Sequence, residues 1–147
     1  MCSAPQESES EVRPLHVAFP ATPGCLRFVR AALGGMGLPD ELSRDATLLT
    51  NELVTNSIRH AGLGPDDLID VTAEWSGATL RVVVLDGGAG SLPSGVVAGS
   101  IRPAPGSQSG WGLYLVDKLA SRWGTNVGGT RGFWFELEEP RRRNGGA

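Results

Sequence analysis

The sequence predicts an α/β protein of the α+β sandwich type, in which a mixed, mostly antiparallel sheet has helices packed on one face. Three observations support this class. Segment 13–20 alternates apolar and polar residues, as half-buried strands do. Segment 40–62 repeats apolar residues every three or four positions, as amphipathic helices do. The predicted order is strand, helix, helix, strand, strand, long loop, helix, strand, which suggests two packed layers.

The size and composition predict one globular domain. A chain of 147 residues is the size of one domain, which we place at 13–139, between disordered tails at 1–12 and 140–147. The net charge of -3 gives no general reason to expect direct contact with nucleic acid or a membrane. No stretch approaches the ~18 apolar residues that cross a bilayer, and the acidic start is unlike a secretory signal. Cys2 and Cys25 fit no metal spacing, so we expect free thiols in a reducing cytosol and a cytoplasmic protein.

The first predicted elements are a strand over 13–20 and a helix that begins after Thr22. A hydroxyl cap at Thr22 followed by Pro23 is a typical helix start. The helix is expected to end at Gly34-Gly35. The apolar positions of the strand are Leu15, Val17 and Phe19, and the buried stripe of the helix would be Leu26, Val29 and Leu33.

The strongest predicted helix runs from a capping Asp40 to Gly62, which would end it in a left-handed conformation. Glu52 and Asn56 lie four residues apart on one face of this helix. A carboxylate and an amide cost free energy when they are buried without partners, so these side chains should face solvent or a ligand. The core stripe of the helix would be Leu42, Ala46, Leu49 and Leu53.

The rest of the chain is predicted to form two strands, a long loop, a helix and a closing strand. The two strands cover about 67–75 and 78–85 and are joined by a tight turn at Ser76-Gly77. Residues 91–109 are rich in Gly, Pro and Ser and are predicted to be a loop. The helix lies within 110–124, with Leu113, Val116, Leu119 and Ala120 facing inward. The closing strand, within 129–139, has Phe133 and Phe135 on one face.

The residues after the second of these strands indicate one candidate ligand site. The strand ends in Asp86, and Gly87, Gly88 and Gly90 follow. A carboxylate only accepts hydrogen bonds, so it suits a donor such as the exocyclic amine of adenine. Glycines would let the backbone approach a flat ring. The alternative interpretation is an ordinary Asp-Gly turn.

Glycines before the third helix indicate a second candidate site. In segment 109–116, backbone N–H groups at a helix start would favour phosphate by geometry and by dipole. The Gly-Lys-Ser/Thr ending of the common phosphate loop is absent, and so is the third glycine of a dinucleotide fingerprint. The alternative is a helix that merely follows a glycine turn.

The face that carries Glu52 and Asn56 is a third candidate. An Asn56 oxygen suits Mg²⁺, which prefers hard oxygen ligands and usually keeps several waters. Glu52 could take the proton from an attacking hydroxyl. The alternative is a solvated polar face on a surface helix.

The three features together, in this order, resemble the GHKL ATPase superfamily, and within it the small bacterial anti-sigma-factor serine kinases of the RsbW and SpoIIAB kind. The resemblance covers about 13–138 and implies the Bergerat ATP-binding fold. "NELVTNSIRHA" resembles the N box of the family. The two glycine boxes and the closing strand are matched at Asp86, Gly88 and Gly90, at Gly110, Gly112 and Leu113, and at Thr130.

The resemblance also implies roles for these residues. Glu52 would be the general base, Asn56 the Mg²⁺ ligand and Asp86 the acceptor for the adenine amine. Residues 91–109 would form a short lid over ATP. The other nucleotide contacts would come from Gly88, Gly90, Gly110, Gly112, Leu113 and Thr130. The family often has a Lys-Thr-Val run before the aromatic strand, whereas this chain has Thr130-Arg131-Gly132.

The implied function is that of an ATP-dependent serine/threonine-protein kinase that is also an anti-sigma factor. Its partners would be an anti-anti-sigma protein, phosphorylated on a serine, and a sigma factor, with a homodimer possible. Arg27 and Arg30, off the buried stripe, are candidates for a partner-facing patch, or serve solubility alone. The alternative function is an ATP-binding interaction module without phosphoryl transfer. A histidine kinase domain is disfavoured, because neither His16 nor His60 lies in a phosphoacceptor helix.

Overall fold

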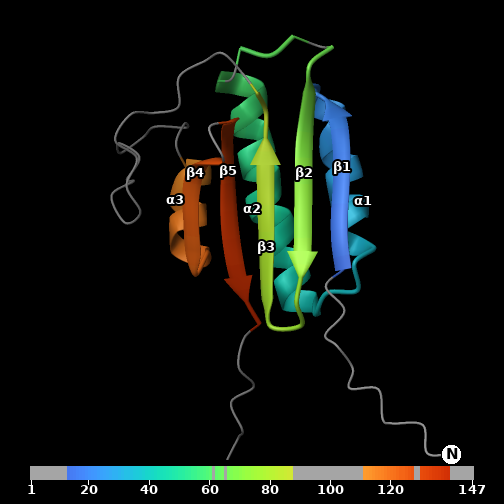
Figure 1. Cartoon of the computed structure of the whole chain (residues 1–147), viewed down its shortest axis with the longest axis vertical. Helices are drawn as coiled ribbons and strands as arrows, with labels where there is room; N and C mark the ends of the chain where they lie inside the picture. The colour runs from blue at the N-terminus through green and yellow to red at the C-terminus, as the bar shows by residue number, and fades with distance from the viewer. Residues whose placement is uncertain (1–12, 61, 65, 88–110, 128–129, 140–147) are drawn as a thin grey trace, which may run out of the picture.

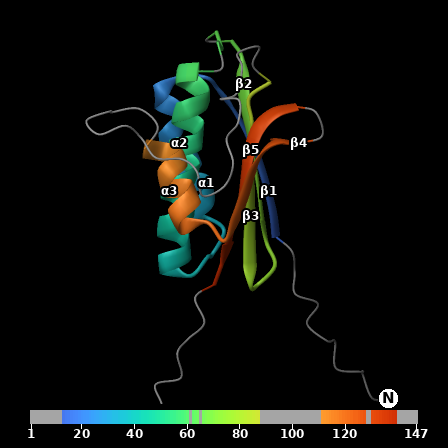
Figure 2. The same ribbon diagram turned by 90° about the vertical axis from the view of Figure 1, so that its left-hand side faces the viewer.

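The structure is a computed structural model that describes residues 13–60, 62–64, 66–87, 111–127 and 130–139. These residues form two layers, a five-stranded sheet and a layer of helices that covers one face of it (Figures 1 and 2). The predicted tails and the predicted 91–109 loop lie outside the described residues.

The sheet has the strand order β1-β2-β3-β5-β4. All four pairings are antiparallel, so the described sheet has no parallel pair where we predicted a mixed, mostly antiparallel one. The α/β fold class and the helices on one face are confirmed (Figure 2). The strands are β1 (Arg13–Pro20), β2 (Leu68–Trp75), β3 (Thr79–Leu85), β4 (Arg122–Val127) and β5 (Thr130–Glu138).

Within the described residues, three α-helices and one 3-10 turn make up the second layer. The start of the first helix differs from the prediction, because Pro23–Cys25 form the 3-10 turn η1 before α1 begins. The Thr22 hydroxyl makes no capping hydrogen bond, so that prediction was wrong; the Thr22 backbone carbonyl instead accepts from Cys25 N at 3.0 Å. The helices are α1 (Leu26–Gly34), α2 (Asp40–His60) and α3 (Trp111–Leu119).

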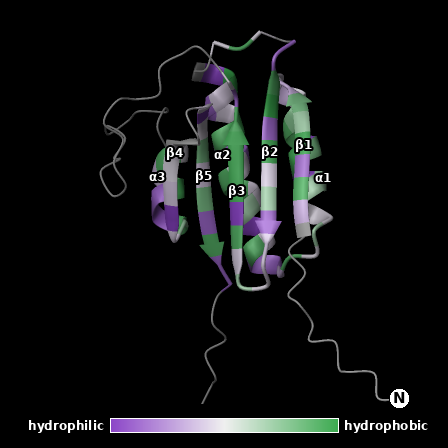
Figure 3. Cartoon of the chain, viewed as in Figure 1, coloured by the Kyte–Doolittle hydropathy of each residue, from purple (hydrophilic) through white to green (hydrophobic). Residues whose placement is uncertain are grey.

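The core lies between the sheet and the helices. Alternate residues of the strands and the predicted stripes of α1 and α2 enter it, and Figure 3 shows hydrophobic and hydrophilic positions mixed along the strands. Gly62 has φ +68°, which agrees with the predicted left-handed end of α2. Fully buried members include Val29, Leu33, Leu49, Leu53, Val82, Val84 and Phe135.

The end of α3 and the strand that follows were predicted wrongly. We predicted a helix within 110–124 and no strand there, but the helix ends at Leu119 and β4 begins at Arg122. Leu119 is 40% exposed rather than inward-facing, because the helix ends there and the chain turns toward β4. β4 lies at the sheet edge and is held by its pairing with β5 and by a 2.9 Å hydrogen bond from Trp123 Nε1 to Asp117 Oδ1. Within the described residues no helix is long and apolar enough to span a bilayer.

Candidate nucleotide site

The second half of α2 carries the two polar side chains that the sequence singled out. Glu52 and Asn56 are both half-buried, whereas Leu53 and Val54 beside them are fully buried. Because four residues make about one helical turn, Glu52 and Asn56 lie on the same side of the helix. The helix thus places a carboxylate and an amide together at the boundary between core and solvent.

The start of α3 lies against Glu52. A Cβ added to Gly112 would lie 2.8 Å from Glu52 Oε2 and 3.2 Å from Glu52 Cβ, both closer than ordinary contacts. Only a residue without a side chain leaves the Glu52 carboxylate in this position. The fold therefore joins the candidate base of α2 to the glycine-containing start of α3, two segments that are 60 residues apart in the chain.

Asp86 lies where β3 ends. Its backbone N–H donates to the carbonyl of Arg131 at 3.3 Å, which continues the β3–β5 pairing by one residue. Gly87, directly after the carboxylate, takes φ +60°, a conformation that favours glycine. The predicted position of Asp86 at a strand end followed by a glycine turn agrees with the structure.

The Asp86 carboxylate is paired with Arg131, a contact that the sequence did not predict. Arg131 Nε lies 3.2 Å from Asp86 Oδ1 and 3.4 Å from Oδ2. The Asp86 side chain is 0% exposed and the Arg131 side chain 8% exposed. One signal was available: alternation from Phe133 and Phe135 places Arg131 on the helix-facing side of β5, an unusual position for an arginine.

The remaining candidate residues are placed as follows. Thr130 is exposed at the start of β5, and its neighbour Arg131 is the residue that contacts Asp86. Leu113 is 6% exposed and packs in the core, so any contact of this residue with phosphate would come from its backbone. Gly88, Gly90 and Gly110 lie outside the described residues.

The described residues fit a magnesium ion that is held mainly by phosphate and water. Where the structure is described, no group of three or more His, Cys, Asp or Glu side chains could form a protein cage for a metal. Mg²⁺ usually keeps several waters and takes one or two protein oxygens together with substrate phosphates. Asn56, half-buried one turn from Glu52, offers one such oxygen.

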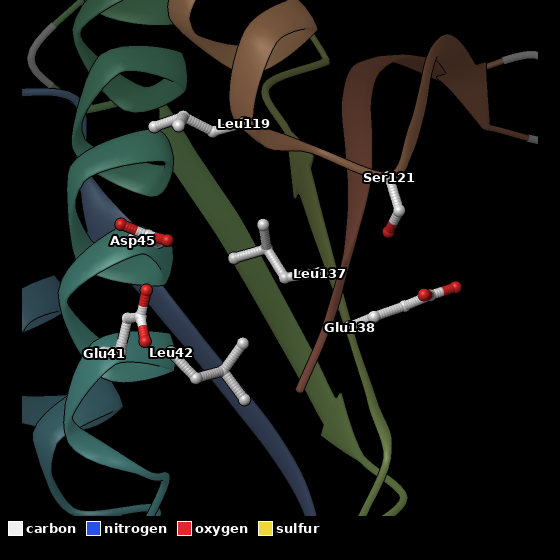
Figure 4. A pocket seen from close by; sticks show the side chains of 7 residues that line it. All are labelled: Glu41, Leu42, Asp45, Leu119, Ser121, Leu137 and Glu138. Atoms are coloured by element: carbon white, nitrogen blue, oxygen red, sulfur yellow. The ribbon is translucent and has the colours of Figure 1, made fainter. Parts of the chain in front are cut away.

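A cavity of about 220 Å³ lies away from these residues, between the first half of α2, the end of α3 and the end of β5. Figure 4 shows Glu41 and Asp45 on the α2 side of it, Leu137 between the layers, and Glu138 directed away from α2. Asp45 precedes Glu52 by seven residues, or about 10 Å along the helix axis. This cavity is therefore separate from the candidate nucleotide site.

Comparison with known proteins shows the family of this chain. The histidine kinase-like ATPase domain family matches residues 19–131, about three quarters of the chain, and the chain belongs to this family. The matched region includes both glycine boxes and ends at Arg131.

A solved structure supports the fold. The crystal structure of the RsbU and RsbW domains of Rv1364c from Mycobacterium tuberculosis resembles this chain with a TM-score of 0.57 at 24% identity. The match covers 85% of this chain but 31% of that chain, so this protein spans about a third of its length. No curated protein matches the sequence.

Proposed function

We propose that this chain binds ATP with Mg²⁺ between α2, α3 and the end of β3, and transfers the γ-phosphoryl group to a serine of a partner protein. The observation that carries this proposal is the contact of Glu52 with Gly112, because it brings a candidate general base to the start of a glycine-headed helix. The family match, to an ATPase domain, supports the choice of nucleotide.

Each candidate residue then has a role. Asp86 accepts from the adenine amine, and Asn56 gives an oxygen to Mg²⁺, which when bound neutralises charge on the triphosphate. Backbone N–H groups at the start of α3 favour phosphate, because a helix N-terminus carries partial positive charge. The base pocket and phosphate contacts are completed by Gly88, Gly90, Gly110, Gly112, Leu113 and Thr130.

The transfer step uses Glu52 as the general base. Glu52 accepts the proton of the serine hydroxyl while the serine oxygen bonds to the γ-phosphorus and the bond to ADP breaks. The phosphorylated partner would be an anti-anti-sigma protein, and the chain would otherwise hold a sigma factor, as a homodimer. The resemblance to anti-sigma-factor kinases and the likeness to a structure that contains an RsbW domain support these partners.

A partner surface is available on the helix layer. Arg27 and Arg30 are exposed on α1. A concavity of about 600 Å³ between α1 and α2 is lined by two cations, Arg30 and Arg44, by one carboxylate, Asp40, by neutral polar residues and by the exposed Leu48. Cationic and apolar groups together suit an acidic, partly apolar protein segment.

The second candidate function is an ATP-binding interaction module without transfer. The two candidates are separated by incubation with labelled ATP, Mg²⁺ and a candidate anti-anti-sigma protein. For a kinase, label moves to a serine of the partner, and Glu52→Ala reduces the rate by about 10²–10⁴-fold, the usual loss for a general base. For a binding module, nucleotide binds but no label moves.

Glu41→Gln is the matched control. Glu41 is an exposed glutamate in the first turn of the same helix, far from Gly112. We expect this variant to transfer phosphate at the wild-type rate. An equal loss in both variants would mean that charge on α2, rather than a base at Glu52, supports the reaction, and would contradict the proposed role.

A further inference from the structure

The ion pair between Asp86 and Arg131 is almost completely buried, and it lies at the proposed base pocket. Nε of Arg131 donates a hydrogen bond to Oδ2 of Asp86 at 3.4 Å and also lies 3.2 Å from Oδ1. The contact therefore restricts the directions in which the carboxylate can point.

Stability alone is a weak reason for such a pair. Burying two charges removes them from water, and replacing a buried ion pair by apolar residues is often neutral or stabilising. The neighbours of Arg131 on the same side of β5 are Phe133 and Phe135, so an apolar residue would continue the pattern. The arginine at this position therefore indicates a function for its positive charge and its N–H donors other than stability.

The sheet fixes where the pair lies. Leu85 pairs with Gly132, and Asp86 N donates to Arg131 O, so the backbones of the two residues face one another across β3 and β5. Gly132 tolerates no side chain, because a Cβ there would overlap the carbonyl oxygen of Val84. Neither strand can slide without breaking these contacts.

We propose that Arg131 is a positioning residue that sets purine selectivity, by holding Asp86 as an oriented acceptor for the 6-amino group of the base. The inference rests on the proposed function, and it assigns to this chain a residue outside the glycine boxes. A carboxylate has about four acceptor positions, so it can accept from Arg131 and from a base amine together.

The chemistry predicts which bases are rejected. An ionised carboxylate cannot donate, so a keto oxygen at position 6 would place two acceptors against each other. Inosine triphosphate has this oxygen and is otherwise close to ATP. Without Arg131, Asp86 loses the contact that orients its carboxylate toward the base, and this discrimination weakens.

The test measures dissociation constants for ATP and inosine triphosphate by calorimetry. The quantity of interest is the ratio of the two dissociation constants. One hydrogen bond to a charged group corresponds to a ratio of about 10–100-fold in favour of ATP. We expect Arg131→Met to reduce this ratio by about tenfold or more, and Arg131→Lys, which retains the charge, to keep most of it. Arg131→Gln is measured in the same way if Arg131→Met does not fold.

Arg81→Met is the matched control. Arg81 is also an arginine in an ion pair, with Glu136 at 3.2 Å, but it lies on β3 on the face of the sheet away from the helices and is partly exposed. Arg81→Met should leave the ratio of the dissociation constants for ATP and inosine triphosphate unchanged.

Two results would overturn the inference. The first is an unchanged ratio in Arg131→Met or Arg131→Gln, with both nucleotides weakened equally, which would indicate a purely structural arginine. The second is a loss in Arg131→Lys as complete as in Arg131→Met. Failure of the wild-type protein to bind either nucleotide would instead contradict the proposed function, so the two failures are distinguishable.

Discussion

At the scale of single residues, the position of Glu52 depends on the missing side chain at Gly112. An added methyl group would lie 2.8 Å from the carboxylate oxygen and 3.2 Å from Glu52 Cβ, so Glu52 or the start of α3 must move. Misplacing a catalytic group by about 1 Å can cost about 10²-fold in rate. We expect Gly112→Ala to reduce phosphoryl transfer about 10–100-fold, as measured with labelled ATP and the partner protein.

Gly34→Ala provides the comparison for this variant. Gly34 also lies in a helix, but a Cβ there meets nothing within 4 Å. Because alanine is favoured over glycine inside helices, we expect this change to leave the transfer rate unaltered and stability equal or slightly higher. If Gly112→Ala behaves in the same way as Gly34→Ala, then the contact with Glu52 does not control the reaction.

The Cys25 thiol gives a second prediction at the residue scale. Burial raises its pKa above the ordinary value of 9.0, because the thiolate is disfavoured away from water. The folded protein therefore keeps a proton that the unfolded chain releases, and stability should fall as pH rises above about 9. In a Cys2→Ser background, we expect the free energy of unfolding to fall more steeply between pH 9 and 10.5 when Cys25 is present than in Cys25→Ala. Chemical denaturation at each pH measures it. Equal slopes of unfolding free energy against pH in the two proteins would contradict this prediction.

At the scale of elements, the pairing of β3 with β5 depends on Gly132. This glycine lies opposite Leu85, and a side chain there would overlap the Val84 carbonyl and the Leu85 side chain. Backbone atoms of a central strand cannot yield easily, and overpacking typically costs about 1–3 kcal/mol. We expect Gly132→Ala to lower the free energy of unfolding by this amount in urea titrations.

Gly24→Ala is the corresponding control, because a Cβ at Gly24 has open space. Its free energy of unfolding should stay within about 0.5 kcal/mol of wild type, as is usual for surface changes. A Gly132→Ala protein as stable as Gly24→Ala would show that β3 and β5 can separate without cost.

The elements differ in how well the sequence predicted them. β1 and α2 were predicted within about two residues, because their apolar periods are regular and their ends carry proline, aspartate or glycine. β4 was missed because the chain around Trp123 shows no alternating pattern. Its strand conformation comes from pairing with β5 and from the hydrogen bond of Trp123 to Asp117, which no local sequence signal contains.

At the scale of the whole molecule, nucleotide binding should stabilise the fold. A ligand at about 100 times its dissociation constant adds about 2.7 kcal/mol, which corresponds to roughly 5–10 °C in Tm for a chain of this size. We expect ATP with Mg²⁺ to raise Tm in this range in a thermal unfolding assay. Chelation of Mg²⁺, or Asn56→Ala, should reduce the shift, and no shift with any adenine nucleotide would contradict the proposal.

The candidate site was predictable in part. The residue types at Glu52, Asn56 and Asp86 indicated acceptors and a base, and the structure places Glu52 at α3 and Asp86 at a glycine turn. Sequence reasoning placed Thr130 at the adenine end, whereas the structure puts Arg131 against Asp86. Thr130 was assigned from its place in the family motif. The residue that contacts Asp86 depends instead on which side of β5 each side chain faces.

The sequence by itself determined the helices and most strands, the apolar positions that enter the core, and the order of the glycine-rich segments. These features are local, because helical and strand periods and turn residues act within a few positions along the chain. Only the tertiary structure decided that Glu52 meets Gly112, that Asp86 pairs with Arg131, and that β4 completes the sheet edge. The first two contacts join segments far apart in sequence, and the third joins neighbouring strands. All three depend on strand register and helix packing, which the whole core sets at once.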